Sequence, residues 1–190
     1  MPQPSYVIQP LTKEYIDVTL QLCDASMGNG YLSKDFLCSC LNNPKVFFYI
    51  LLNPADNDVI GYSYNEVYNA SEFWRQVKPF FPSEQHFQLP DGVCCKVATL
   101  GIKMDYRGQA LAKTLLDYVM DSISRSTHID FFVGTAWKQD DYVPIASTLD
   151  KIGFVPICIL HRPWHDVAAC CSYCKKKRCI CDAALYIKSC

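Results

Sequence analysis

The sequence predicts an α/β fold in which helices flank a mixed, mostly antiparallel sheet, in a single domain that covers residues 1–190. Apolar runs of strand length alternate with segments of helical periodicity, and some runs follow each other closely enough to form hairpins. Half of the residues are hydrophobic, and 18 basic side chains nearly balance 19 acidic ones, which excludes a disordered charged tail. A chain of this length can bury one sizeable core.

The first third of the chain predicts one strand, two helices and a hairpin. In order they are a strand at 6–8, a helix between Thr12 and Gly28, a helix between Ser33 and Asn42, and strands at 46–52 and 59–68. Thr12 and Ser33 are residue types that cap helices. The expected inward residues recur at helical spacing in the helices and at alternate positions in the second hairpin strand: Ile16, Leu20, Cys23, Phe36, Leu37, Cys40, Leu41, Ile60, Tyr62 and Tyr64.

The remaining elements continue the alternation. In order they are a connector at 69–92, a strand at 93–103, a helix at 109–124, a strand at 129–133, a helix from Asp140 or Asp141 to Ile152 closed by Gly153, and strands at 154–160 and 183–188. The helix at 109–124 has the clearest apolar stripe. The connector carries several aromatic residues that either line a site or cover the sheet: Phe73, Trp74, Phe80 and Phe81.

A strand, a turn of small residues and a helix follow one another at residues 100–113. The first turn of a helix leaves backbone N–H groups unpaired, and its dipole favours an anion there. Gly108, Ala110 and Ala112 would let a ligand approach this backbone, and Arg107 can add positive charge. The segment is therefore either a phosphate site or an ordinary strand-to-helix connection.

Residues 107–112, Arg-Gly-Gln-Ala-Leu-Ala, resemble motif A of the GCN5-related N-acetyltransferases, the GNAT superfamily, with Ala110 in place of its first glycine. Residues 149–154, Leu-Asp-Lys-Ile-Gly-Phe, resemble the family's closing motif, and the element order also matches. The resemblance implies acetyl-coenzyme A as cosubstrate. It implies that the pantetheine arm pairs with Leu100, Gly101 and Ile102. It also implies a set of residues around the pyrophosphate, namely Arg107, Gly108, Gln109, Ala110, Leu111, Ala112 and Lys113.

Direct transfer of an acetyl group to an amine needs a base, an oxyanion donor and an acid for the leaving thiolate. In the family a tyrosine often acts as the general acid, and Leu149 stands at its position here. Tyr142 is therefore the candidate that brings a hydroxyl to this helix. Tyr142 is equally compatible with simple packing at a helix start. Glu66 is the candidate base, and a solvated strand carboxylate is its plainer interpretation. The neighbouring thiols Cys94 and Cys95 fit buried apolar positions rather than a nucleophile.

Six of the 12 cysteines lie in the last 21 residues, within or after an insert at about 165–182 in the last hairpin. Cys171, Cys174, Cys179 and Cys181 offer four thiolates, the ligand set of a structural zinc site. Cys170, His161 and His165 are alternative ligands. Reduced thiols without metal and disulfides remain the other interpretations. We expect the insert to shape the acceptor site.

The run Lys175–Lys176–Lys177–Arg178 lies inside the insert. It fits either a solvated loop tip or a contact with nucleic acid, which is the less favoured partner. The leading hypothesis is an acetyltransferase for an amine acceptor of unknown size. The alternative is an inactive GNAT-like binding protein that is stabilised by zinc and contacts nucleic acid or protein. We expect a cytoplasmic protein without a membrane partner, and the sequence is compatible with a homodimer.

Overall fold

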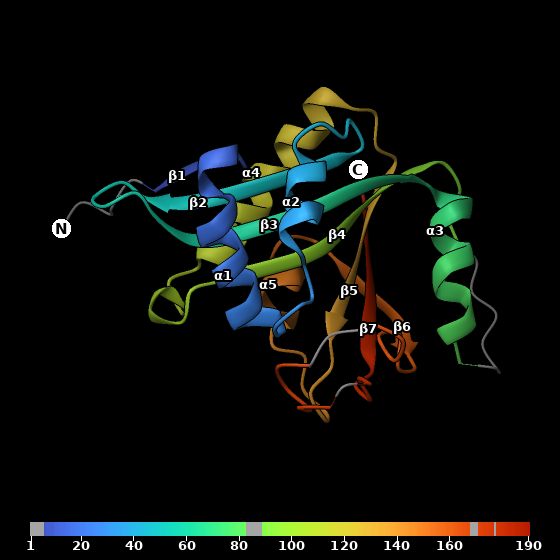
Figure 1. Ribbon diagram of the computed structural model, residues 1–190. Helices are drawn as coiled ribbons and strands as arrows, with labels where there is room; N and C mark the ends of the chain where they lie inside the picture. The colour runs from blue at the N-terminus through green and yellow to red at the C-terminus, as the bar shows by residue number, and fades with distance from the viewer. Residues whose placement is uncertain (1–5, 83–88, 168–170, 177) are drawn as a thin grey trace.

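Seven strands form one sheet in the order β1-β2-β3-β4-β5-β7-β6 (Figure 1). The computed structural model describes residues 6–82, 89–167, 171–176 and 178–190. The strands are β1 (Val7–Pro10), β2 (Val46–Asn53), β3 (Asp58–Asn69), β4 (Val93–Ile102), β5 (Phe131–Trp137), β6 (Val155–Leu160) and β7 (Ala183–Ser189). Neighbouring strands are antiparallel except for β4 and β5, which are parallel. This arrangement confirms the mixed, mostly antiparallel sheet.

Helices cover both faces of the sheet. They are α1 (Ile16–Met27), α2 (Lys34–Cys40), α3 (Ala70–Val77), α4 (Leu111–Ser126) and α5 (Ala146–Lys151), with 3-10 turns η1 (Lys13–Tyr15), η2 (Lys78–Phe80) and η3 (Met104–Tyr106). One apolar core lies between α4 and the sheet, and another between the sheet and α1 and α2. A third core gathers α3, β5 and β7. Among the described residues, no helix is long and apolar enough to cross a bilayer.

The aromatic connector covers the sheet. Asn69 caps α3 through a bond from the Ser71 N–H to its side chain. Phe73 is fully buried, and the Trp74 ring stacks on Phe131 with centroids 5.9 Å apart. The connector therefore closes the third core.

Two local expectations, one about a helix and one about the hairpin, need correction. The Thr12 hydroxyl donates to the Glu14 carboxylate at 3.2 Å instead of capping the helix, and η1 precedes α1. Ile60 is the extra residue of a bulge, because Leu51 pairs with Gly61 and Leu52 with Val59. Ile60 therefore packs under α4, on the face opposite to Tyr62 and Tyr64.

The last helix is shorter than expected. Asp140 has a φ of 50°, and the backbones of Gln139 and Tyr142 bond to each other at 2.7 and 2.9 Å in a tight turn. Pro144 disfavours helical geometry in the residue before it, so α5 begins at Ala146. Its end agrees with expectation, since Gly153 has a φ of 86° and the Phe154 N–H bonds to the Leu149 carbonyl at 2.9 Å.

Candidate functional site

The parallel strands β4 and β5 separate halfway along their length. Their pairing runs from Cys94 opposite Phe131 to Val97 opposite Gly134 and ends there. Beyond this point β4 pairs only with β3, and β5 pairs only with β7 (Figure 1). The stretch of β4 that holds Leu100, Gly101 and Ile102 therefore presents an edge with no strand partner among the described residues, which an extended ligand can pair with.

A bulge in β4 lies at the point of separation. Tyr64 pairs with Thr99 and Asn65 with Val97, which leaves Ala98 as the extra residue. A bulge interrupts the ladder and redirects the backbone groups of the bulged strand. A redirected N–H at this place is the kind of donor that can stabilise an oxyanion.

The turn after β4 presents backbone amides at the start of α4. Gly108 has a φ of 79°, and Ala110 lies in the left-handed region with φ 58° and ψ 13°. The Thr114 N–H bonds to the Ala110 carbonyl at 3.1 Å, so the amides of residues 111–113 form the open first turn of the helix. No side chain caps this helix. The arrangement is a concave set of N–H donors suited to an anion.

The polar side chains of the same turn are partly engaged within the protein. The Arg107 Nε donates to the Ile102 carbonyl at 3.0 Å, which holds the turn against the end of β4. The Gln109 Oε1 accepts from the Tyr6 hydroxyl at 3.2 Å, and the Lys113 Nζ lies 2.5 Å from an Asp117 carboxylate oxygen. Binding of an anion here would therefore depend mainly on the backbone.

Glu66, the candidate base, lies on β3 among tyrosines. The hydroxyls of Tyr64 and Tyr68 donate to its Oε2 at 2.8 and 2.5 Å. Burial, followed by these bonds to Glu66, raises the pKa of both tyrosines, so both remain protonated donors. Lys96 lies opposite Glu66 in the ladder, and burial lowers its pKa against the opposing effect of the carboxylate. Glu66 and Lys96 thus lie opposite each other, and Lys96 is two residues from the bulge at Ala98.

Tyr142, the other candidate, lies in the turn before α5 and not on a helix. Its side chain is 64% exposed, and its backbone pairs with Gln139. Tyr142 therefore does not pack at the start of a helix either. Among the described residues the structure brings Tyr142 and Glu66 into no common hydrogen bond.

Sequence reasoning missed a polar network beneath the start of the α1–α2 loop. The Tyr62 hydroxyl lies 2.8 Å from the Ser26 Oγ, and it acts to lower the pKa of Cys23, which burial raises to about 12. Tyr31, in the loop, packs against the core beneath α1 and α2, and the Thr99 side chain beside the β4 bulge acts on its pKa, which burial raises. The alternation of Tyr62, Tyr64, Glu66 and Tyr68 along one strand face was the available signal for part of it.

The four predicted metal ligands come together in space. The sulfur atoms of Cys171, Cys174, Cys179 and Cys181 all lie within 4.8 Å of one another, and those of Cys171 and Cys181 are 3.9 Å apart. Thiolates arranged tetrahedrally around zinc at about 2.3 Å stand about 3.8 Å apart. We call residues 171–176 and 178–181 the knuckle. Cys170 and Lys177 lie outside the described residues, and His161 bonds instead to Asp182 at 3.0 Å.

The surroundings lower the pKa of one knuckle thiol, Cys174, and raise the pKa of two others, Cys179 and Cys181. Burial acts to raise the pKa of Cys174, but the N–H groups of Ile180 and Lys176 outweigh it and bring the pKa down to about 7. The buried Trp137 Nε1 has no hydrogen-bond partner among the described residues, and the Trp137 side chain acts to lower the pKa of Cys181, which burial raises to about 11. Trp137 also packs against the cysteine cluster. A thiolate at Cys181 would give this unpaired N–H an acceptor, which is a typical arrangement around a metal ligand.

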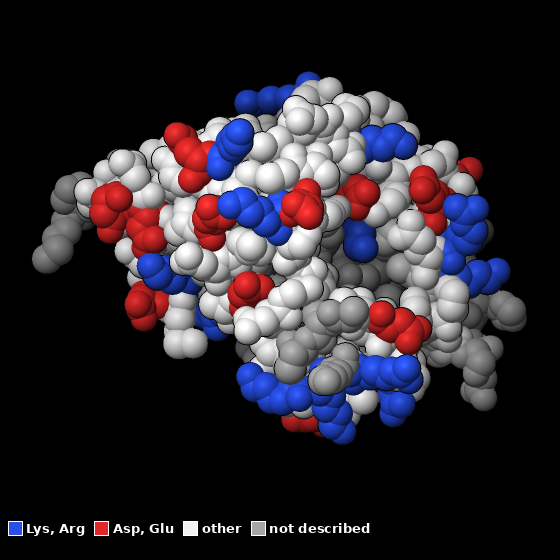
Figure 2. Space-filling model, viewed as in Figure 1, with Lys and Arg blue, Asp and Glu red and all other residues white. Residues whose placement is uncertain are grey.

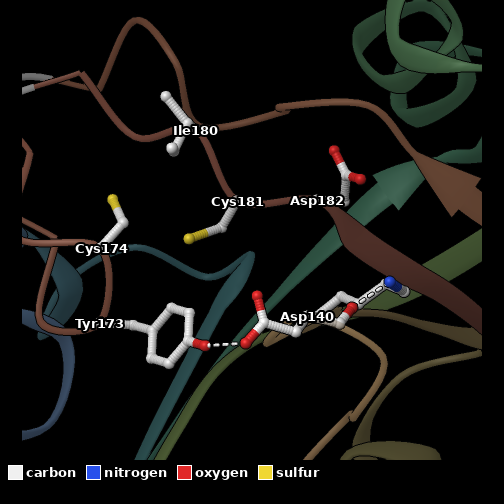
Figure 3. Close-up of a pocket in the computed structure, with 7 residues that line it drawn as sticks. Asp140, Tyr173, Cys174, Ile180, Cys181 and Asp182 are labelled. Atoms are coloured by element: carbon white, nitrogen blue, oxygen red, sulfur yellow. Dashed lines mark hydrogen bonds between the residues drawn. The ribbon is translucent and has the colours of Figure 1, made fainter.

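A pocket of about 180 Å³ lies beside the knuckle (Figure 3). Its walls are Lys138, Asp140, Tyr173, Cys174, Ile180, Cys181 and Asp182. The Tyr173 hydroxyl donates to an Asp140 carboxylate oxygen at 2.8 Å, which connects the knuckle to the turn after β5. Two of the four knuckle cysteines, Cys174 and Cys181, thus line a pocket that also contacts the end of β5.

Comparison with solved structures identifies the architecture. NAA60 from Arabidopsis thaliana, in complex with a bisubstrate analogue, superposes with a TM-score of 0.71 over 98% of this chain and 99% of its own, at 14% identity. This chain has the GNAT fold. The GNAT acetyltransferase of the NatC complex bound to Gag peptide and CoA matches with a TM-score of 0.66 at 18% identity, and covers 98% of this chain and 99% of its own.

A bacterial GNAT enzyme gives a similar result. The ribosomal-protein-S18-alanine N-acetyltransferase from Escherichia coli matches with a TM-score of 0.65 at 10% identity, over 97% of this chain and 94% of its own. The sequence itself matches no known family model and no curated protein at a significant level. The structural matches thus establish that this chain has the GNAT fold.

Proposed function

We propose that this GNAT-fold protein transfers the acetyl group of acetyl-coenzyme A directly to an amine. The observation that carries the proposal is the unpaired edge of β4 leading straight into the open amides at the start of α4. Leu100, Gly101 and Ile102 would pair with the pantetheine arm as an added strand. The backbone of residues 108–113 would hold the pyrophosphate.

The reacting groups would meet where β4 and β5 separate. The amide at the Ala98 bulge would stabilise the oxyanion of the tetrahedral intermediate. Holding the thioester and the amine together can supply on the order of 7–11 kcal/mol of the barrier reduction. A base that removes the ammonium proton would raise the reaction rate by a further factor of about 10²–10⁴.

Glu66 is the base in this proposal. Both tyrosine hydroxyls donate to its Oε2, so Oε1 is the oxygen that would receive the proton, directly or through water. Tyr142 is proposed as the acid for the leaving thiolate. Its replacement by Phe should lower kcat if it has this role and leave kcat unchanged if it does not.

We further propose that the four knuckle cysteines bind zinc. The support is the clustering of four thiols at tetrahedral spacing, together with the Trp137 N–H beside Cys181. Zinc held by four protein thiolates has no open position, so its role would be structural. Metal analysis of protein purified without chelator tests this, and about one equivalent is the expected content.

Two measurements test the enzymatic proposal. Titration calorimetry should detect binding of coenzyme A to the folded protein, and thiol release from acetyl-coenzyme A should rise with at least one member of an amine panel that includes peptide N-termini. Absence of binding at millimolar coenzyme A would overturn the proposal. Binding without thiol release would favour an inactive binding protein.

The exposed basic tip of the knuckle supports a second candidate function, contact with nucleic acid. Lys175, Lys176 and Arg178 are exposed, and Figure 2 shows basic side chains gathered at the end of the molecule where the knuckle lies. A gel shift with single-stranded RNA that weakens with salt, and that disappears when these three residues are neutralised, would support this function. The absence of any shift at low salt would exclude it.

A further inference from the structure

The knuckle contacts a part of the chain that is remote in sequence. The Ser172 Oγ donates to the Ser26 carbonyl at 3.1 Å, and the Ser172 N–H bonds to the Met27 carbonyl at 3.3 Å. Ser26 and Met27 form the last turn of α1, where carbonyl groups have no partner within the helix. Ser172 therefore donates two hydrogen bonds to carbonyl groups at the end of α1.

The contact continues from α1 into the sheet. The Ser26 Oγ lies 2.8 Å from the Tyr62 hydroxyl, and the Tyr62 ring packs so closely on Gly101 that a Cβ at Gly101 would lie 2.3 Å from it. Gly101 belongs to the unpaired edge of β4. The knuckle is thus connected through two side chains to the back of the strand on which the proposed cosubstrate site rests.

The loop after α1 reaches β4 at its other end. Tyr31 packs against the core beneath α1 and α2 and lies close enough to the Thr99 side chain, next to the bulge at Ala98, for Thr99 to act on its pKa. Between these two attachments the loop contains Gly28 and Gly30, both with positive φ, and is stabilised by short local bonds to Asp24. Such a loop has little rigidity of its own and depends on its attachments.

We propose that the metal-bound knuckle is a clamp that orders the end of α1 and the loop after it over β4, with Ser172 as the positioning residue. This inference rests on the zinc site proposed above, and it rests on the proposed acetyl transfer only in assigning the clamped loop to the acceptor side of the site. The four metal–sulfur bonds would fix the knuckle, and Ser172 transmits that order to Ser26 and Met27. Metal binding then controls the loop as well as the hairpin that contains the knuckle.

Hydrogen–deuterium exchange tests the clamp without any substrate. In the full-length zinc protein, Ser172→Ala should speed exchange of the amides of residues 28–31 by about 3- to 10-fold, since one hydrogen bond is lost. Zinc content should stay at about one equivalent. Ser126→Ala is the matched control, because the Ser126 Oγ also donates to a helix carbonyl, at the end of α4. It should leave exchange in residues 28–31 unchanged.

Removal of zinc by a chelator should speed exchange in residues 28–31 by more than Ser172→Ala does. Unchanged exchange there in both Ser172→Ala and chelated protein would overturn the clamp, even if the knuckle itself opens. Failure to bind coenzyme A would instead overturn the proposed function and leave the clamp intact. Where an acceptor amine is established, Ser172→Ala should raise the KM for that amine more than the KM for acetyl-coenzyme A.

Discussion

Ala110 occupies a backbone conformation that favours glycine, with φ at 58°. The left-handed region costs a residue with a Cβ about 1 kcal/mol or more. Ala110→Gly should therefore raise the free energy of unfolding by about 0.5–1 kcal/mol, and it gives the proposed pyrophosphate more room. Urea unfolding and coenzyme A calorimetry measure the two effects.

The matched control for this change is Ala112→Gly. Ala112 lies two residues further on, inside the first turn of α4, where glycine lowers stability by up to about 1 kcal/mol. The two substitutions should thus change the urea midpoint in opposite directions. A lower midpoint for Ala110→Gly would contradict the left-handed conformation.

Glu66 is the residue on which the proposed proton transfer depends. Glu66→Gln keeps an oxygen that can accept from Tyr64 and Tyr68 but removes the base, so kcat should fall by about 10²-fold or more. Glu14→Gln changes an exposed carboxylate of η1 and should leave kcat intact. Equal kcat values for the two variants would remove Glu66 from the mechanism.

The knuckle is an element whose order depends on four thiols. Cys174→Ser should lower the zinc content from about one equivalent to nearly none, and Tm should fall by roughly 5–15 °C because the connection between β6 and β7 loses its cross-link. Cys38→Ser replaces an exposed thiol of α2 and is the control. Full zinc retention in Cys174→Ser would show that another ligand completes the site.

Prediction from the sequence succeeded for elements whose own residues determine them. The stripe of α4, the Ser33 cap of α2 and the Gly153 closure of α5 are local patterns, and the structure confirms all three. The sequence pattern gave a wrong prediction at two places where a single residue interrupts a regular element. Asp140 with positive φ removes the expected helix start, and the bulge at Ile60 reverses a face.

Part of the candidate site was also predictable, because that part consists of local sequence patterns. The spacing of the four knuckle cysteines is visible in the sequence, and so is the turn at residues 107–113. The contact between Ser172 and Ser26 joins residues 146 positions apart, and no periodicity encodes it. The parting of β4 from β5 likewise depends on two separate ladders and not on either strand alone.

The whole molecule should lose stability in alkaline solution. Burial raises the pKa of Cys23 to about 12 and that of Cys40 and Cys94 each to about 11. Above pH 9 the unfolded chain releases protons from these thiols while the folded chain retains them, so the stability present below pH 9 falls as pH rises. Each thiol contributes roughly 1 kcal/mol per pH unit in this window.

Urea unfolding at pH 8, 9.5 and 10.5 measures this decline. Cys23→Ala should make the decline shallower, whatever it does to stability at pH 8. Cys38→Ser should leave the slope as it is, because Cys38 is exposed. A flat profile between pH 8 and pH 10.5 would contradict the proposed role of the buried thiols.

The parallel seam between β4 and β5 covers only four residue pairs, and it joins the half of the sheet built from β1–β4 to the half built from β5–β7. Under mechanical tension applied across the sheet, this short seam should yield before the longer antiparallel ladders on either side. A molecule lodged between the diverging ends would bridge both halves. Such an occupant should raise the rupture force measured by single-molecule pulling, so the site where the ligand is proposed to bind also lies at the short joint between the two halves of the sheet.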